Sequence, residues 1–500
     1  MQLWVEDEPE ISFGKGSRHV DPRAGLAQFG PFLAGGQAAP LGSINVGVVG
    51  PREALSQVTQ WLQRLESPID ADPGDSLLFP SFPGFSGAFR STLQMPDALR
   101  RQIPEEEVQR VLDLEEPAAM VNRAAALYVS RVAELVGGVE PRPAVVVCAI
   151  SQDIEDHCWS AIGSKPTPAR TKAIRVTKRL HESGQLQLTD FIPDEELVPV
   201  VETHPGGTSL RALIKAGAMQ CGIPTQLLRE STVSGGRTVQ PLGTLAWNFA
   251  VGLYYKAGGF PWRLSKVDET TCFIGISFYR EKVRDPITMG TAVAQVFDQT
   301  GEGLILKGER LQWVKEERFS PHMSNAAATK LGKDIQAAFE KRPGNPHPPS
   351  RLVFHKTSRF WPEEIAGLKA ALGGTAALEF LAVEASDIRL VRDGQYPPLR
   401  GTCAKLGPRE YLIYGMGYIP YLNTYPGHHV PKPIHVLEHI GESAPEVACR
   451  ELLGLTKLNW NTSQFCCGVP ITVNIARKVS AVLAELKSGD KVEPSYRFYM

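Results

Sequence analysis

Two short apolar runs, each next to a helix-like segment, constrain the fold of this chain most strongly. The runs, 44–50 and 144–150, consist almost entirely of small and branched apolar residues, and segments 53–66 and 118–135 carry apolar residues at helical spacing. Strands without polar alternation, separated by helices, are typical of parallel strands buried on both faces. We therefore expect an α/β domain, interrupted by an irregular excursion rich in Pro, Gly and Phe near 70–100.

The part of the chain after residue 265 follows a different order. We expect three strands in an antiparallel meander, followed by an alternation of strands and helices. The expected strands are 271–279, 290–297, 303–307, 351–355 and 411–416, and the expected helices are 323–342, 362–372 and 472–486. This is the order of an RNase H-like fold. We therefore divide the chain into two α/β domains, residues 1–265 and residues 266–500.

Composition limits the classes of protein to which the chain can belong. Its 500 residues are 43% hydrophobic with a net charge of -1, as in globular proteins with sizeable cores. A run of basic residues without acids at 165–179 fits either a nucleic-acid contact or a solvated surface. None of the eight Cys forms a C-x-x-C pair, which favours free thiols over a zinc site. The sequence has no signal peptide and no apolar run that approaches the roughly 20 residues needed to span a bilayer, so we expect a cytoplasmic protein.

A set of cations and amides near the end of the first domain fits an anion pocket. Arg211 and Lys215 are four residues apart, so they share one face of a predicted helix. Gln226 directly follows a Gly-Ile-Pro-Thr turn, and Lys256 ends a second predicted helix that also carries Asn248. Such a set can donate several charge-assisted hydrogen bonds, which suits the oxygens of a terminal phosphate.

The order and spacing of these motifs resemble the MID domain of Argonaute proteins, and downstream motifs resemble the PIWI domain. The downstream motifs are 273–277, 352–357, 459–461, 469–471 and 474–476. The resemblance covers nearly the whole chain and implies a Rossmann-like MID domain followed by an RNase H-like PIWI domain. It also implies a site for the 5′-phosphate of a guide strand, made by Arg211, Lys215, Gln226 and Lys256 with Asn248 near the first nucleotide. Arg211 stands where many relatives carry a Tyr.

Argonautes that cut their target hold two divalent metals with acidic PIWI residues, and this chain departs from that pattern. The matching positions carry Ser277, Thr357 and Asn474. Two hydroxyls and an amide supply no negative charge for two Mg²⁺ ions, so the resemblance implies an inactive nuclease. A register error is the alternative, but the next acids, Glu281 and Glu363, would lie beyond their strands or on the wrong face.

Two further groups of residues contain side chains of the kinds that bind metals. The glutamate that completes an active PIWI site has no clear counterpart, and Glu302 fits a surface turn better. His428 and His429 lie in a segment bracketed by prolines, and His435 follows shortly after. A loop that contacts backbone phosphate or packs on the core is favoured there over a metal site.

The resemblance also implies an ion and several partners. The MID-like pattern begins close to Met1, which leaves no room for a PAZ domain and indicates a short prokaryotic Argonaute. The expected partners are a guide RNA, a single-stranded DNA target and an APAZ-containing subunit with a TIR, sirtuin-like or nuclease effector that acts in antiviral or anti-plasmid defence. The C-terminal carboxylate of Met500 is implied to bind Mg²⁺ together with guide phosphates. An active guide-directed endonuclease and a metabolic α/β enzyme with a small phosphorylated ligand remain as alternatives.

Overall fold

A parallel sheet forms the centre of the first half of the chain, as the two apolar runs predicted. Its strands, in spatial order, are β5 (Thr92–Gln94), β4 (Ser43–Pro51), β7 (Val145–Ile150) and β8 (Thr225–Arg229), and β6 (Arg100–Ile103) also pairs with β4. All of these pairs are parallel. Every residue of β7 is buried, which explains why this strand reads as a continuous apolar run.

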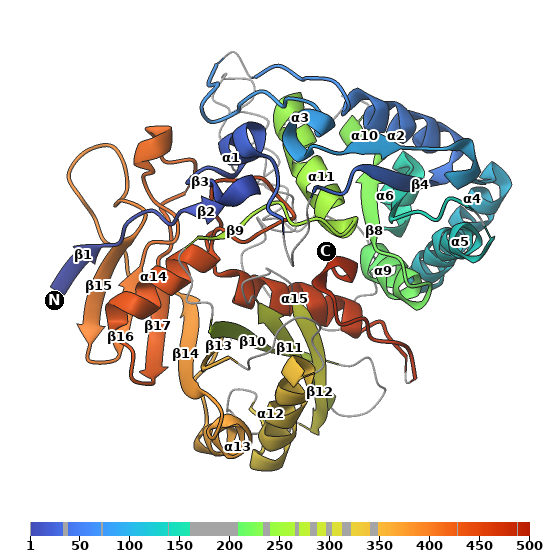
Figure 1. Cartoon of the computed structure of the whole chain (residues 1–500). Coiled ribbons are helices and arrows are strands. Elements are labelled where there is room, and N and C mark those ends of the chain that lie inside the picture. Colours follow the sequence, from blue (N-terminus) through green and yellow to red (C-terminus); the bar gives the residue numbers. More distant parts are fainter. Residues whose placement is uncertain are drawn as a thin grey trace.

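Helices cover both faces of this sheet (Figure 1). Alternate residues of β7 belong to two different hydrophobic cores, because successive strand side chains point to opposite faces. Helices α2 (Arg52–Arg64) and α11 (Leu242–Lys256) pack on one face, and α5 (Pro117–Gly138) and α9 (Leu210–Gln220) pack on the other. Shorter elements of this half are α1 (Pro22–Phe29), α3 (Phe85–Phe89), α4 (Glu105–Leu112), α6 (Gln152–Cys158) and α10 (Glu230–Val233).

A nine-stranded mixed sheet forms the second half. Its spatial order is β1 (Gln2–Val5), β15 (Thr402–Gly407), β16 (Glu410–Ile413), β17 (Ile434–Ile440), β14 (Ala377–Ala385), β13 (Arg351–Lys356), β10 (Thr271–Arg280), β11 (Thr288–Val296) and β12 (Leu304–Gln312). The meander β10–β11–β12 is antiparallel, and β13 runs parallel to both β10 and β14. The predicted meander and the strand–helix alternation after it are therefore confirmed.

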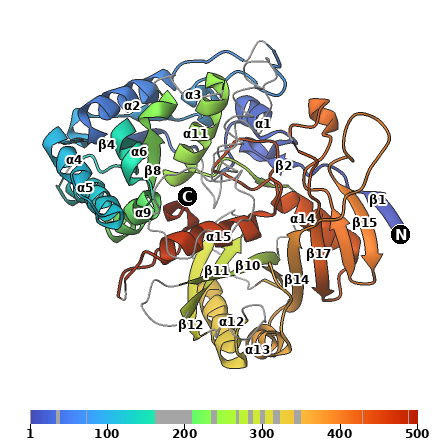
Figure 2. The ribbon, with the colours of Figure 1, turned by 180° about the vertical axis from the view of Figure 1, so that it is seen from behind.

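Helices also cover both faces of the larger sheet. Helices α12 (Asn325–Glu340) and α13 (Pro362–Leu372) share a core with Leu352 and Phe354 of β13. Val353, which points to the other face, belongs to the core that contains α14 (Pro445–Leu455) and α15 (Ile471–Leu483). Helix α15 and the C-terminus lie between the two halves in both views (Figures 1 and 2).

One element crosses the predicted boundary at residue 265. Strand β1 belongs by sequence to the first half, yet it pairs antiparallel with β15 at the edge of the second sheet. Nearer the boundary, β9 (Arg263–Leu264) pairs with β2 (Ile11–Ser12), which also pairs with β3 (Arg18–His19). The division into 1–265 and 266–500 therefore needs correction for residues 2–5.

The computed structural model describes most of the chain. The described residues are 2–33, 39–71, 74–138, 140–160, 209–233, 241–265, 270–280, 288–296, 303–312, 322–340, 349–427, 429–487 and 489–500. None of the helices within these ranges is long and apolar enough to span a lipid bilayer.

Candidate functional sites

Helix α9, strand β8 and the end of helix α11 bring predicted phosphate ligands together. The Lys215 Nζ atom donates a 2.9 Å hydrogen bond to the carbonyl oxygen of Thr225, the first residue of β8. The Lys256 Nζ atom donates to the side-chain oxygen of the next residue, Gln226, at 2.6 Å. Each lysine is only 2% exposed. Two buried cations and one amide therefore converge at the start of β8, as the motif spacing predicted.

The local backbone explains how these three elements meet. Helix α9 ends at Gln220, and Gly222 turns the chain into β8 with a φ of 70°. A side chain at residue 222 would be strained in this left-handed conformation, which glycine adopts readily. Lys256 is the last residue of α11, and Gly258, with a φ of 108°, leads the chain away from that helix end.

The C-terminal residues complete the cluster. The Arg211 guanidinium on α9 donates a 3.2 Å hydrogen bond to the backbone carbonyl oxygen of Tyr499. The hydroxyl of Tyr499 donates in turn to the carbonyl of Glu493, and both Tyr499 and Met500 are buried. The C-terminal segment is therefore buried, and Arg211 joins it to the first half of the chain.

The electrostatic environment of Lys256 is strongly positive. Burial lowers the pKa of its ammonium group well below the ordinary value, and the nearby charges of Arg211 and Lys478 lower it further. Lys478 lies on α15, so a cation of the second half adds to the cluster. An anion would relieve this repulsion, which makes the cluster suited to phosphate. Sequence reasoning missed Lys478 because it belongs to none of the recognised motifs.

Asn248 occupies a different position from the other predicted ligands. Its side-chain oxygen accepts hydrogen bonds from the hydroxyl of Thr462 at 3.0 Å and from the backbone nitrogen and hydroxyl of Ser463, each at 2.9 Å. These bonds fasten α11 to the loop before α15. In this structure Asn248 therefore joins the two halves of the chain, two helical turns before Lys256.

Ser277 and Thr357, two of the positions matched to catalytic acids, lie side by side. Ile276 of β10 pairs with Lys356 of β13, so the next residue of each strand follows at the same edge. Thr357 is exposed, whereas the Ser277 hydroxyl lies 2.9 Å from the hydroxyl of Ser480 on α15. The first two matched positions are therefore neighbours in the strand register.

The residue of α15 that contacts Ser277 is Ser480, which the sequence analysis did not single out. Asn474, the third predicted position, lies six residues earlier on α15. Six residues correspond to about 9 Å of rise and a rotation of about 240°, so the two side chains leave the helix in different directions. Serine hydroxyls and an amide are poor ligands for Mg²⁺, which prefers carboxylates. The residues at this edge therefore do not fit a pair of catalytic metal ions.

Two buried polar residues precede Thr357 on β13. The Lys356 ammonium group donates to the carboxylate of Glu364 at 2.6 Å, and Glu364 also accepts from the backbone of Met323 and Trp361. His355 Nδ1 lies 2.8 Å from the hydroxyl of Thr472 at the start of α15. Burial lowers the pKa of His355 to about 3, so this imidazole is neutral in the folded protein.

Several residues discussed in the sequence analysis fall outside the part of the chain that the structure describes. Residues 165–179, Glu281, Glu302 and His428 lie outside the described residues. His429 is exposed, and His435 lies 2.9 Å from the carboxylate of Glu410. Within the part of the chain that the structure describes, no three His, Cys, Asp or Glu side chains form a group that could hold a metal ion.

Comparison with known proteins gives one curated relative and several solved structures. No protein-family model matches the chain. The protein argonaute of Aquifex aeolicus is 22% identical over 276 residues, which covers 54% of this chain and 35% of that protein. Clostridium butyricum Argonaute, solved with a guide DNA and a 19-mer target DNA, matches with a TM-score of 0.64 at 13% identity, over 98% of this chain and 53% of its own. Drosophila Piwi matches with a TM-score of 0.60 at 15% identity, over 99% of this chain and 56% of its own.

These likenesses identify the fold. The chain spans about half the length of the solved structures and about a third of the curated relative. At such low identity, agreement over almost the whole chain concerns the arrangement of elements, and this arrangement is that of Argonaute MID and PIWI domains.

Proposed function

We propose that this chain, which has the fold of Argonaute MID and PIWI domains, binds a guide strand by its 5′-phosphate and uses that guide to recognise a second nucleic acid. One observation carries the proposal: Lys215, Lys256 and Gln226 meet at the start of β8, with Arg211 and the C-terminal residues beside them. A buried cationic cluster of this kind suits a terminal phosphate, which accepts several hydrogen bonds from charged donors.

The nature of the two strands is part of the proposal. We propose a guide RNA and a single-stranded DNA target, although the Clostridium butyricum structure contains a guide and a target that are both DNA. In such a mode of recognition, base pairing reads the sequence and the protein holds the strands by their backbones. The affinity should therefore depend steeply on salt concentration, because each neutralised phosphate releases counterions.

We further propose that the protein binds its target without cutting it. Two cations must neutralise the charge that develops during cleavage of a phosphodiester, and such cations need carboxylate ligands. The side chains at this edge of β10 and β13 supply only hydroxyl groups, which belong to Ser277, Thr357 and Ser480. The output would then be a signal to an APAZ-containing effector subunit in defence against phages or plasmids.

A single Mg²⁺ ion fits this proposal only in combination with the guide. The residues around Arg211 are cationic, and the terminal carboxylate of the buried Met500 is the anionic group that the C-terminus contributes. Guide phosphates would supply the remaining oxygen ligands, and the ion would reduce the repulsion between them.

The direct test compares 5′-phosphorylated and 5′-hydroxyl strands of the same sequence in a fluorescence anisotropy titration. Lys256→Met removes the charge but keeps an unbranched side chain, and each charge-assisted hydrogen bond contributes roughly 1.5–3 kcal/mol. We expect this variant to bind the phosphorylated strand about 10-fold or more weakly and the hydroxyl strand almost as well as the unmodified protein. Lys333→Met, at an exposed position on α12, is the matched control. Equal losses for both strands would refute the assignment.

A further inference from the structure

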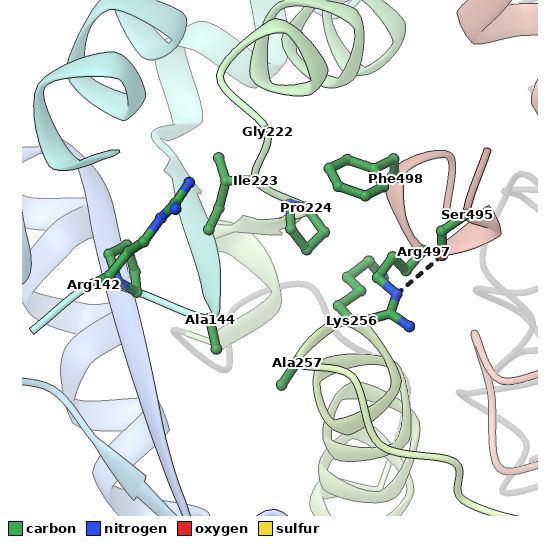
Figure 3. Close-up of a pocket in the computed structure, with 11 residues that line it drawn as sticks. Arg142, Ala144, Gly222, Ile223, Pro224, Lys256, Ala257, Ser495, Arg497 and Phe498 are labelled. Atoms are coloured by element: carbon green, nitrogen blue, oxygen red, sulfur yellow. Dashed lines mark hydrogen bonds between the residues drawn. The ribbon is translucent and has the colours of Figure 1, made fainter. Parts of the chain in front are cut away.

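We call Arg211, Lys215, Gln226 and Lys256 the guide-phosphate cluster. A pocket of about 400 Å³ lies next to this cluster, on the side of the sheet where β7 and β8 begin. Its walls come from the turn before β8, the end of α11 and the C-terminal segment (Figure 3). Pro224 and Phe498 provide an apolar wall, and Arg142, Lys256 and Arg497 provide cations. None of the eleven lining residues, all of which lie in the described ranges, is acidic. The volume lies within the usual range for sites that bind small molecules.

A hydrogen bond and the absence of a side chain at Gly258 allow Arg497 to lie at the end of α11. Its Nε atom donates a 3.0 Å hydrogen bond to the hydroxyl of Ser495. A Cβ atom on Gly258 would lie only 3.1 Å from a terminal nitrogen of Arg497, so the glycine leaves space for this guanidinium. Figure 3 shows the Arg497 side chain beside Lys256. An arginine oriented in this way can donate two parallel hydrogen bonds to one phosphate group.

The pocket and the guide-phosphate cluster share Lys256. The same residue lines the pocket and donates to Gln226, so an anion in the pocket would lie next to the first phosphate of a bound guide. Arg211 and Lys478 repel the charge of Lys256, which shows that the positive potential extends across this region. One phosphate group would leave part of this cationic surface unmatched, whereas a chain of phosphates offers further oxygens to the cations that line the pocket.

We propose that this pocket is a second phosphate-binding subsite, which takes the polyphosphate chain of a 5′-triphosphorylated strand or of a free nucleotide. The proposal rests on the proposed function for the position of the first phosphate. The pocket itself consists of residues outside the guide-phosphate cluster, apart from Lys256. Phosphate oxygens would accept hydrogen bonds from the two arginines, and Phe498 and Pro224 would close the apolar side.

The experiment measures the affinity of the whole chain for 5′-triphosphate and 5′-monophosphate strands of one sequence. We expect the triphosphate strand to bind about 10-fold or more tightly, since the two arginines add charge-assisted hydrogen bonds. Arg142→Gln and Arg497→Gln should each move the ratio of the two affinities towards one. Arg142→Gln should also leave the monophosphate affinity within about twofold, because Arg142 lies outside the guide-phosphate cluster. Arg123→Gln, at an exposed position on α5, is the matched control.

A second arm separates the two sources of polyphosphate. Inorganic tripolyphosphate and ATP are titrated by calorimetry into strand-free protein and into protein that already holds a monophosphorylated guide. Binding of tripolyphosphate or ATP that Arg142→Gln abolishes would identify a free nucleotide as the ligand. Tighter binding of the triphosphate strand without binding of tripolyphosphate or ATP would identify the 5′ end of the guide as the ligand. Tripolyphosphate binding without any strand binding would support the pocket and refute the proposed function. Two results would overturn the subsite. One is equal affinity for the triphosphate and monophosphate strands together with no tripolyphosphate binding. The other is a preference for the triphosphate strand that both arginine variants retain.

Discussion

At the scale of single residues, the depressed pKa of Lys256 couples guide binding to proton uptake. Burial and two neighbouring cations disfavour its charged form in the free protein, and a bound phosphate would favour that form. The bound pKa is thus higher than the free pKa. We expect the affinity for a 5′-phosphorylated guide to be greatest below the free pKa and to fall as pH rises towards the bound pKa.

Calorimetry in two buffers of different ionisation enthalpy measures this proton uptake directly. A 5′-hydroxyl strand should take up fewer protons than a 5′-phosphorylated strand. If the two strands take up the same number, Lys256 does not sense the phosphate.

His355 should make the free energy of unfolding depend on pH in the acidic range. Its pKa is lowered from the ordinary value of 6.5 to about 3, so only the unfolded chain binds a proton between these values. The contribution of His355 to folding is complete above the unfolded pKa and is lost as pH falls through this window. The loss amounts to about 1.4 kcal/mol per pH unit. Urea unfolding of the unmodified protein and of His355→Gln, compared at several pH values, should show a shallower slope for the variant.

The sequence predicted that Lys215, Gln226 and Lys256 lie together, because they belong to motifs with fixed spacing. It missed Lys478, Arg497 and Ser480, which reach their positions through contacts between segments far apart in the chain. Arg497, for example, meets Gly258 across more than 200 residues of sequence. Such contacts depend on the packing of the two halves, which spacing within one segment does not encode.

At the scale of elements, the approach of α15 to β10 connects the two candidate sites. A Cβ atom on Gly275 would lie 2.0 Å from the carbonyl oxygen of Thr472, in the first turn of α15. We expect Gly275→Ala to shift α15 and to lower the free energy of unfolding by about 1–3 kcal/mol or more. Because α15 also carries Lys478, the same variant should weaken binding of a 5′-phosphorylated guide.

Gly374→Ala is the control for this substitution, since a Cβ atom there would meet nothing within 4 Å. Urea unfolding and guide titration of both variants provide the measurements. Unchanged stability of Gly275→Ala would mean that the helix and strand tolerate the added methyl group.

Patterns of apolar residues predicted several elements: β4 and β7 as continuous apolar runs, β10 as an apolar strand and α12 as a helix. Strands β14 and β17 were missed, although each is largely buried. Buried strands of mixed composition lack the regular alternation that distinguishes a half-exposed strand, so the sequence alone gave little signal there. Strand β1 is only four residues long and is paired with a partner from the other half, which no local pattern could indicate.

At the scale of the whole molecule, the protein should bind a matched target and leave it intact. Guide-loaded protein is incubated with complementary DNA or RNA in the presence of Mn²⁺, and the products are separated on a denaturing gel. We expect full-length target only, because the edge between β10 and β13 carries hydroxyl groups where carboxylates would be needed. A defined product opposite the middle of the guide would show that other residues supply the metal ligands.

The order of motifs predicted the fold of both halves of the molecule. The order of motifs did not predict which residues join the two halves. Asn248 binds the loop before α15, and Arg211 binds the C-terminal segment. Each of these contacts pairs residues more than 200 positions apart, and their identity follows only from the folded arrangement.

Strand β1 also affects when this molecule can finish folding during synthesis. Gln2 pairs with Lys405, so about 400 residues separate the partners of one antiparallel ladder. A ribosome adds about 5–20 residues per second, so β1 emerges roughly 20–80 s before its partner strand. During this interval the exposed Leu3 and Val5 have no native sheet edge to join. Strand β1 is therefore synthesised long before the sheet edge that it joins, and it must avoid pairing with other strands until that edge has formed.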